Sequence, residues 1–275
     1  MTIKRWLEQA RTKLQAAGID SARLDARILA ESVLHKSRTW LLAHGPDKLT
    51  PAQRARLDQL LVLRIQRQPL AYILGTKEWY GLDFKITSDV LIPRPETETL
   101  VKAAIERAGQ GASGLELGTG SGCMAVALKV NRPDLSLTAA DVSASALKIA
   151  RFNARRHSAK IKFVLSDLFK DVHGRFDLVL ANLPYVPDGT RRQLELDYEP
   201  SLALYGGTDG LDYYRQFLPA LSAHLAPGGQ AIIEAGPTQR AELKILAGDA
   251  GFKLSSLSEY ASLLTPSRAS FSNPI

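Results

Sequence analysis

The apolar positions of the chain follow two spacings, and the change between them divides the sequence. Over the first quarter they recur at the 3.6-residue period of a helix, at Ile3, Trp6, Leu7, Ala10 and Leu14 and again at Leu57, Leu60, Leu61 and Ile65. Thr50 before Pro51 is typical of a helix start, because the hydroxyl accepts from an early backbone N–H and proline needs no intrahelical partner there. Residues 1–76 are therefore predicted to form a small helical bundle.

Past residue 77 the pattern becomes extended. Short extended segments fill residues 79–92 and end at Pro93-Arg94-Pro95, where two prolines forbid a regular helix, so 77–95 is predicted to be an extended or hairpin linker. From 96 to 275 helix-like stretches such as 123–130 and 144–155 separate apolar runs of strand length, at 115–117, 135–140, 161–165, 176–180 and 230–234. This alternation predicts an α/β, Rossmann-like domain with a mainly parallel sheet, helices on both faces, and ligands at the carboxyl ends of the strands.

Composition excludes several classes of protein. The 275 residues, 45% of them hydrophobic, can form a large and a small domain. The single cysteine, Cys123, excludes an internal disulfide, and the five histidines lack metal-ligand spacing, so no metal is expected. Because no apolar run could span a bilayer and residues 1–15 lack a signal-peptide pattern, we expect a cytoplasmic protein with no membrane partner.

Positive charge is concentrated at the start of the chain. Residues 1–75 hold thirteen Lys and Arg against six Asp and Glu, a net charge of +7 that equals the formal net charge of the whole chain. Such asymmetry indicates that this part meets an acidic partner, protein or nucleic acid. The alternative is a solvated helical surface with surplus lysine and arginine.

A glycine loop follows the first predicted strand of the α/β domain and opens a helix. The stretch runs from Glu116 through Leu117 to Gly118-Thr119-Gly120-Ser121-Gly122. Its glycines allow a tight turn and close approach of the backbone to a ligand. Cys123 stands where a dinucleotide fingerprint needs glycine, and the shorter G-x-G-x-G loop fits the amino-acid part of S-adenosyl-L-methionine (SAM) instead. A purely structural glycine turn is the alternative.

Two further segments suit the rest of this cofactor. Asp141 ends the second strand, at the spacing where an acid accepts hydrogen bonds from ribose hydroxyls; the alternative is an N-cap of the next helix. After the third strand, Asp167 can accept from the exocyclic amine of adenine and Leu168 can pack against the ring. Cys123 is interpreted as a buried packing residue, not a nucleophile.

The chemistry-bearing motif Asn182-Leu183-Pro184-Tyr185 comes directly after the fourth strand. A planar amide or aromatic-amine nitrogen is a poor nucleophile, so an enzyme must fix its NH2 group with acceptors. The side-chain oxygen of Asn182 and the backbone carbonyl of Leu183 can be those acceptors. Pro184 restricts Leu183 to extended geometry, and Tyr185 offers a face for stacking. The motif predicts methyl transfer to a planar NH2 group; a simple turn after a strand is the alternative.

Over nearly its whole length the chain resembles a known family, the bacterial release-factor glutamine methyltransferases. Besides the glycine loop and Asn182 to Tyr185, the matches are Arg-Gln-Pro-Leu-Ala-Tyr-Ile-Leu-Gly at 67–75, Leu-Ile-Pro-Arg-Pro-Glu-Thr-Glu at 91–98, Tyr198-Glu199-Pro200, and Gly206 to Tyr214. The segments at 67–75 and 91–98 are much more selective than any SAM loop. They separate this family from generic adenine-N6 methyltransferases.

The resemblance implies N5-methylation of the glutamine in the Gly-Gly-Gln tripeptide of class I peptide chain release factors, with S-adenosyl-L-homocysteine as coproduct. It implies that an N-terminal helical domain, residues 1–76, helps bind the release factor. It places SAM at Gly118 to Gly122, Asp141 and Leu168, and the glutamine at Asn182 to Tyr185, with Asn182 also beside the cofactor. We expect a monomer with no direct nucleic-acid partner.

Three positions depart from the family pattern. Leu183 replaces a proline, and activity is expected to survive because the acceptor there is a backbone carbonyl. Leu168 replaces a tryptophan of some relatives, which weakens adenine stacking. The stretch 260–268 lacks the usual Gly-Arg-Asp-Arg ending, which leaves the last strand without a prediction.

Three other functions remain open. A glutamine methyltransferase acting on a ribosomal protein would share the fold and the Asn182 motif, and only the first hundred residues argue against it. An adenine-N6 nucleic-acid methyltransferase would suit the basic charge, but the chain has no recognisable nucleic-acid module. A non-catalytic SAM-binding adaptor is supported only by Leu183.

Overall fold

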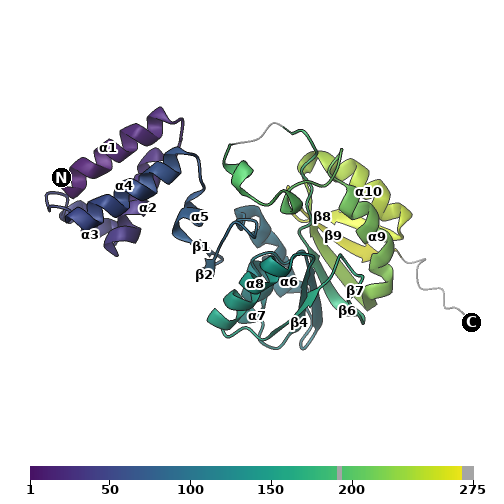
Figure 1. Ribbon diagram of the computed structural model, residues 1–275. Helices are drawn as coiled ribbons and strands as arrows, with labels where there is room; N and C mark the ends of the chain where they lie inside the picture. Colours follow the sequence, from purple (N-terminus) through teal and green to yellow (C-terminus); the bar gives the residue numbers. More distant parts are fainter. Residues whose placement is uncertain (191–193, 268–275) are drawn as a thin grey trace, which may run out of the picture. The chain divides into compact units, whose positions relative to one another are not determined.

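The computed structural model describes residues 1–190 and 194–267, which divide into two units (Figure 1). Among these residues the first unit comprises 1–75 and 194–198, and the second comprises 76–190 and 199–267. The chain therefore enters the second unit at Thr76, returns to the first for a short segment, and then completes the second.

The first unit is a bundle of helices. They are α1 (Ile3–Ala16), α2 (Ala22–Leu34), α3 (Arg38–Ala43), α4 (Pro51–Ile65) and α5 (Leu70–Leu74). The predicted apolar stripes form its core, where Trp6, Leu14 and Leu57 are almost fully buried. Thr50 begins α4 as expected: its hydroxyl accepts from Gln53 N at 3.2 Å, and the Gln53 side chain accepts from Thr50 N at 2.9 Å. The helical periodicity read from the sequence is confirmed.

A buried ion pair joins α2 and α4 within this unit. Arg64 Nε donates to Asp25 Oδ2 at 2.7 Å, and both side chains are less than a tenth exposed. The 3-10 helix η2 (Leu194–Tyr198) adds to the cluster, since Glu195 accepts from Arg64 at 3.2 Å and from Arg67 at 3.0 Å. Arg67 also donates to the carbonyls of Ala17 and Gly18. The family segment that begins at Arg67 thus holds the returning segment by charge.

The second unit begins with a hairpin of β1 (Thr76–Trp79) and β2 (Leu82–Lys85). Tyr80 and Gly81, at the turn, both have positive φ, as a two-residue hairpin turn of the mirror-image type requires. The indole of Trp79 donates to the carbonyl of Arg94 at 2.8 Å, which fastens the hairpin to the proline-rich stretch after it.

A seven-stranded sheet forms the centre of the second unit, in the order β5-β4-β3-β6-β7-β9-β8. The strands are β3 (Ser113–Leu117), β4 (Ser136–Asp141), β5 (Ile161–Leu165), β6 (Phe176–Ala181), β7 (Leu225–Glu234), β8 (Phe252–Ser256) and β9 (Ala261–Pro266). The first five are parallel, and β9 pairs antiparallel with both β7 and β8. The divergent C-terminal stretch therefore completes the sheet up to Pro266, and residues 268–275 lie outside the described residues.

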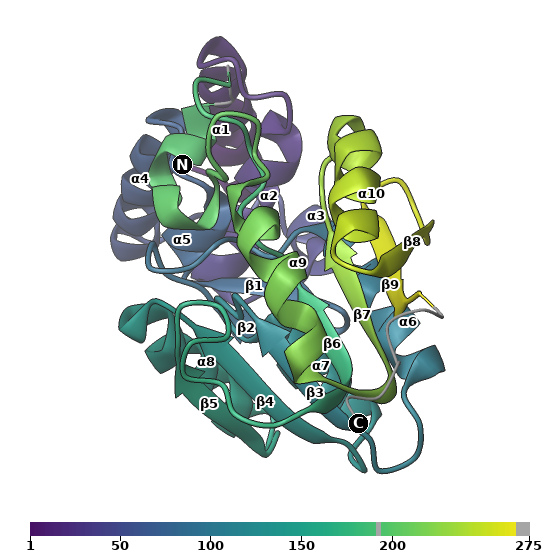
Figure 2. The same cartoon turned by 90° about the vertical axis from the view of Figure 1, so that its right-hand side faces the viewer.

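Helices cover both faces of this sheet (Figures 1 and 2). One face carries α6 (Glu98–Arg107), α7 (Cys123–Asn131) and α8 (Ala144–Arg156), and the other carries α9 (Asp212–His224) and α10 (Arg240–Asp249). The α/β prediction is confirmed, and all five predicted strands are present. The strand order reverses between β3 and β6, so the carboxyl ends of these neighbours open a crevice.

Candidate active site

The glycine loop follows β3 at the edge of this crevice and takes a shape that needs glycine. Gly120 has a φ of +53° and Gly122 a φ of +79°, both in the left-handed region. A Cβ on Gly120 would meet no atom within 4 Å, whereas one on Gly122 would lie 3.0 Å from the Cβ of Ala150 in α8. Gly120 therefore leaves open space on the crevice side, and Gly122 allows the loop to pack on a helix.

Asp141, at the end of β4, fastens the loop from the neighbouring strand. Its Oδ2 accepts from Gly120 N at 2.8 Å and its Oδ1 from Ser143 N at 2.8 Å. Burial raises the pKa of this carboxyl, and the two backbone donors oppose that rise. The N-cap of α8 is Ser143, whose hydroxyl accepts from Ala146 N, so Asp141 does not fill that role. Since each carboxylate oxygen has two lone pairs, Asp141 can still accept from ribose hydroxyls.

The crevice gathers most of the predicted site residues of the second unit. Its lining includes Leu117, Gly118, Gly120, Asp141, Asp167, Leu168, Asn182, Leu183 and Pro184, together with residues the sequence did not single out, among them Val90, Pro200, Leu202 and Tyr213. Polar acceptors thus stand at one end, at Asp141, and at the other, at Asn182, with apolar Leu168 beside them. This combination of a backbone cradle, an acid and an apolar wall fits the amino-acid, ribose and base parts of SAM.

The remaining predicted cofactor residues lie outside this lining. Glu116 is buried beneath the loop, where Oε2 accepts from Thr119 Oγ1 and from Ala125 N, each at 2.9 Å. Burial raises the pKa of Glu116 to about 8. The two hydrogen-bond donors lower this pKa, and the negative charge of Asp141 raises it by a smaller amount. Thr119 and Ser121 are buried as well. These residues shape the loop, and direct contact with a cofactor stays a prediction for them.

Cys123 opens α7 as a buried residue. Desolvation raises the pKa of its thiol to about 12, with a further rise from neighbouring Glu116. A thiol with such a pKa stays protonated at neutral pH and is not a nucleophile. Its position fits the packing role expected from the sequence.

Asn182 follows β6, beside the glycine loop. Its Nδ2 donates to Thr97 Oγ1 at 3.2 Å. With the nitrogen so occupied, Oδ1 remains as an acceptor at the crevice, which Asn182 lines.

The residues that follow Asn182 in the motif contact the protein interior. The Leu183 side chain is buried in the main core, and its backbone hydrogen bonds the hydroxyl of Tyr214 from α9. Tyr214 also donates to the backbone carbonyl of Glu234. Tyr185 is not part of the crevice lining; its hydroxyl donates to Glu234 Oε1 at 3.2 Å. Stacking of a substrate on Tyr185 stays a prediction.

Four residues of this region escaped the sequence reasoning as individuals: Thr97, Glu199, Tyr214 and Glu234. Glu199, which is buried, accepts from Ile92 N at 3.0 Å and from Arg94 at 2.6 Å, so the family segments at 91–98 and 198–200 meet through one carboxylate. Glu234 carried a usable signal, because an acid that ends an apolar strand repeats the pattern of Asp141. Thr97 and Tyr214 lie in segments quoted for the family resemblance, but nothing in their local spacing predicts the contacts that they make.

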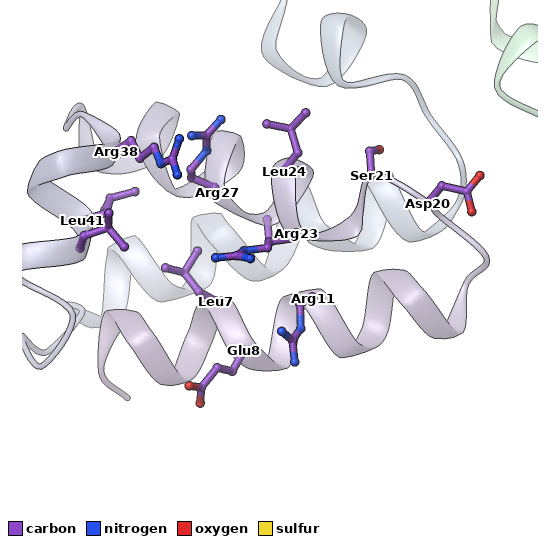
Figure 3. Close-up of a pocket in the computed structure, with 12 residues that line it drawn as sticks. Leu7, Glu8, Arg11, Asp20, Ser21, Arg23, Leu24, Arg27, Arg38 and Leu41 are labelled. Carbon is purple, nitrogen blue, oxygen red and sulfur yellow. The ribbon is translucent and has the colours of Figure 1, made fainter.

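A separate pocket lies in the first unit, between α1, α2 and α3 (Figure 3). We call it the basic pocket; its volume is about 730 Å³, and its lining includes Leu7, Glu8, Arg11, Asp20, Arg23, Leu24, Arg27, Arg38, Leu41 and Leu42. Arg27 faces Glu31 at 3.8 Å, whereas Arg11, Arg23 and Arg38 have no ion-pair partner in the described part of the chain. Leu24 and Leu42 are exposed at its edge. The pocket thus joins unpaired positive charge to apolar surface.

The described ranges, 1–190 and 194–267, hold neither a membrane-spanning helix nor a cluster of metal ligands. None of their helices combines the length and apolar character needed to cross a bilayer. No three His, Cys, Asp or Glu side chains in these ranges cluster closely enough to bind a metal ion.

Comparison with known proteins connects this geometry to a family. A family model described as the PrmC N-terminal domain matches residues 5–75, and one described as the methyltransferase small domain matches residues 95–196. The release factor glutamine methyltransferase of Geobacter sulfurreducens is 40% identical over 239 residues, which cover 86% of this chain and 84% of the relative. The chain belongs to the release factor glutamine methyltransferase family. It is a SAM-dependent methyltransferase, as the glycine loop and Asn182 predicted.

Other similarities agree. The release factor glutamine methyltransferase of Koribacter versatilis is 39% identical over 244 residues, covering 86% of this chain and 87% of that relative. Among solved structures, a methyltransferase from Pyrococcus furiosus shares the fold, with a TM-score of 0.52 and 21% identity over 68% of this chain and 89% of that chain. The resemblance noted from the segments at 67–75 and 91–98 is confirmed.

Proposed function

We propose that the protein transfers the methyl group of SAM to the side-chain nitrogen of the glutamine in the Gly-Gly-Gln tripeptide of class I peptide chain release factors, in the cytoplasm. One observation carries the assignment. The cofactor cradle at Gly120 and Asp141 and the paired acceptors at Asn182 and Leu183 stand at the ends of adjacent strands, in one crevice. The named relatives supply the substrate class.

Residues of this chain fit each part of the cofactor. Open space at Gly120 admits the amino-acid part, Asp141 has lone pairs left for ribose hydroxyls, and Leu168 offers an apolar contact for the base. Bound SAM supplies an electrophilic methyl group on a sulfonium. Asp167 accepts from Lys170 at 2.5 Å on the surface and keeps further lone pairs for the exocyclic amine of adenine.

The chain's contribution to the chemistry is to orient the amide. Asn182 Oδ1 and the Leu183 carbonyl accept the two N–H bonds of the glutamine NH2, which turns the nitrogen toward the methyl group. With SAM bound, a nitrogen–carbon bond would form as the carbon–sulfur bond breaks, and the proton would leave the nitrogen for solvent afterwards. Because the positive sulfonium activates the methyl group, no general base is needed before transfer. Leu183 in place of proline keeps the carbonyl that this role requires.

The basic pocket supports a second proposal, that the first unit binds the release factor through an acidic surface. The net charge of +7 on residues 1–75 and the unpaired Arg11, Arg23 and Arg38 would attract carboxylates, while Leu24 and Leu42 would cover apolar side chains. Such a contact adds affinity away from the reacting glutamine.

The test of the substrate is transfer of labelled methyl from SAM to a purified release factor. We expect label on the wild-type factor and none on a variant whose tripeptide glutamine is replaced by alanine. Equal labelling of both refutes the assignment. Label appearing instead on a ribosomal protein, or on an adenine-containing oligonucleotide, would favour one of the two rival substrates.

The test of the site uses Asn182→Ala. We expect methyl transfer to be lost while SAM binding, measured by calorimetry, stays within about threefold of wild type, because the substitution removes an acceptor of the substrate nitrogen. Asn131→Ala, on α7 away from the crevice lining, is the matched control and should transfer normally. Loss of SAM binding in Asn182→Ala would mean that the residue serves the cofactor instead.

A further inference from the structure

The carboxylate of Glu234, the last residue of β7, is fully buried behind the Asn182 motif. Its Oε1 accepts from the Tyr185 hydroxyl at 3.2 Å, whereas its Oε2 meets no donor in hydrogen-bond geometry. A buried carboxylate with an unsatisfied oxygen lowers the stability of a fold. Its presence beside the acceptor motif therefore indicates a role other than stability.

Thr97 connects this carboxylate to Asn182. The Thr97 hydroxyl is buried and accepts from Asn182 Nδ2 at 3.2 Å. A hydroxyl has one hydrogen, so that hydrogen must point away from Asn182. The acidic group next to it is Glu234: burial raises the pKa of Glu234 to about 7, and the neighbouring polar groups of Thr97, Tyr185 and Asn182 oppose that rise.

An ionised carboxylate can only accept hydrogen bonds, which gives this chain of contacts one direction. Thr97 and Asn182 both lie beside the carboxylate, so the Thr97 hydrogen is drawn toward Glu234, its lone pair faces Asn182, and the amide of Asn182 turns its nitrogen toward Thr97 and Glu234. Its oxygen is then left for the crevice. We propose that Glu234 is a positioning residue for methyl transfer, whose buried carboxylate, together with Thr97, holds the amide nitrogen of Asn182 and so leaves its oxygen turned toward the substrate nitrogen.

A neutral group at position 234 no longer fixes which groups donate and which accept in these hydrogen bonds. A protonated carboxyl or a glutamine can itself donate to Thr97, whose hydroxyl is then free to donate to Asn182 Oδ1. The amide of Asn182 can then invert and present its NH2 group to the NH2 group of the substrate, where two donors meet and no hydrogen bond forms. The inverted state binds SAM as well as before and does not align the glutamine.

The experiment compares Glu234→Gln with wild type on the same release factor, and so rests on the proposed function. We expect kcat to fall about 10- to 100-fold, as for loss of a hydrogen bond to a charged group, while SAM affinity and thermal stability are not reduced. Glu98→Gln, the same change at a half-buried carboxylate of α6, is the matched control. Unchanged kcat in Glu234→Gln overturns the proposal, and so does a fall in kcat that is matched by lost SAM affinity or stability.

Thr97 supplies a second arm. Thr97→Val keeps the shape and removes the hydroxyl, so it should lower kcat like Glu234→Gln, and the double variant should be no worse than either, because both break one chain of contacts. Thr97→Ser, which restores a hydroxyl, should recover activity. Additive losses in the double variant would show that the two residues act separately and would overturn the proposal.

The pH profile is a readout that a merely structural role would not move. The groups facing Glu234 are Glu96 from η1 (Pro95–Thr97), Tyr185 after β6 and Tyr214 from α9. Both tyrosines have raised pKa values and stay neutral, so Glu234 is the group among these that burial brings into the neutral range. Wild-type kcat/KM should fall as pH drops through about 7, and Glu234→Gln should lack this fall. An identical acid limb in both proteins contradicts the proposal. If wild type itself does not methylate the release factor, the proposed function has failed instead.

Discussion

Alanine should have different effects at two glycines of the cofactor loop: at Gly122 it should mainly lower stability, and at Gly120 it should mainly lower SAM affinity. At Gly122, alanine would have to adopt a φ of +79° and bring its Cβ to 3.0 Å from the Ala150 Cβ and 3.1 Å from its Cα. The left-handed backbone costs about 1–2 kcal/mol and the overpacking about 1–3 kcal/mol, so Gly122→Ala should lower the free energy of unfolding by about 2–5 kcal/mol.

Gly120→Ala carries only the first of these costs. Its φ of +53° is left-handed too, but no atom lies within 4 Å of the added Cβ, so stability should fall by about 1–2 kcal/mol. That methyl group instead projects into space on the crevice side, which Gly120 lines. If it clashes with bound cofactor by the usual overpacking cost of about 1–3 kcal/mol, SAM affinity drops roughly 5- to 150-fold.

Urea unfolding without cofactor and calorimetric titration with SAM separate the two effects. We expect Gly122→Ala to unfold more readily than Gly120→Ala and, under conditions where it is folded, to bind SAM within about threefold of wild type, since its Cβ points at α8. The reverse pattern, with Gly122→Ala stable but unable to bind SAM, would refute the account of this loop.

Three further outcomes follow from charged groups. Burial raises the pKa of Glu116 from 4.5 to about 8, so the folded protein holds the proton more tightly than the unfolded chain. This proton contributes up to about 5 kcal/mol to the free energy of unfolding at a pH below 4.5, and the contribution is lost as pH rises toward 8. Urea unfolding should therefore show Glu116→Gln gaining on wild type between pH 5 and 8, unlike exposed Glu106→Gln; a pH-independent difference contradicts this. Asp25→Ala removes the buried partner of Arg64 and leaves it Glu195, so it should cost about 1.5–3 kcal/mol of stability, against less than about 1 kcal/mol for Glu31→Ala, whose 3.8 Å pair is partly exposed; equal costs by urea unfolding would be contrary evidence. Raising the salt concentration should slow association with a release factor, measured by stopped-flow, because salt screens the positive charge of the first unit. The double variant Arg11→Gln with Arg23→Gln should show a smaller salt effect. An equal salt effect in both proteins would mean that the first unit is not the docking surface.

Local patterns predicted the framework of the site because they are repeated within a few residues. Apolar runs and their spacing located the strands on either side of the crevice, and the glycine loop and Asn182 follow those strands directly. Asp141 was found for the same reason. The parallel topology then brings these strand ends together without any further information from the side chains.

The part of the site that the sequence did not predict depends on contacts between residues far apart in the chain. Glu234 meets Tyr185 across 49 positions, Asn182 meets Thr97 across 85, and Glu199 meets Arg94 across 105. No periodicity or spacing encodes such pairs. The two selective family segments supported the family assignment, yet their physical reason emerges only in the fold, where Glu199 accepts from Ile92 and Arg94 of one segment and Glu195 accepts from Arg67 of the other.

The departure at position 183 also gains an explanation. Leu183 is 3% exposed and lies within the main core, so its side chain contributes packing behind the crevice where proline would contribute stiffness. The Tyr214 hydroxyl, bonded to the Leu183 backbone and to the carbonyl of Glu234, restrains the chain in another way. That the Leu183 carbonyl accepts from the substrate nitrogen stays a prediction.

The return of η2 to the first unit has a consequence for synthesis on the ribosome. Arg67 emerges 128 residues before Glu195, its partner in the ion pair, and at about 5–20 residues per second that is an interval of roughly 6–26 seconds. The five helices can assemble in that time, since Arg64 already has Asp25 beside it. Until translation has passed Asn182 and reached Glu195, the Arg67 side chain lacks its carboxylate partner. The nascent first unit therefore reaches its final form only once the methyl-transfer motif has been made.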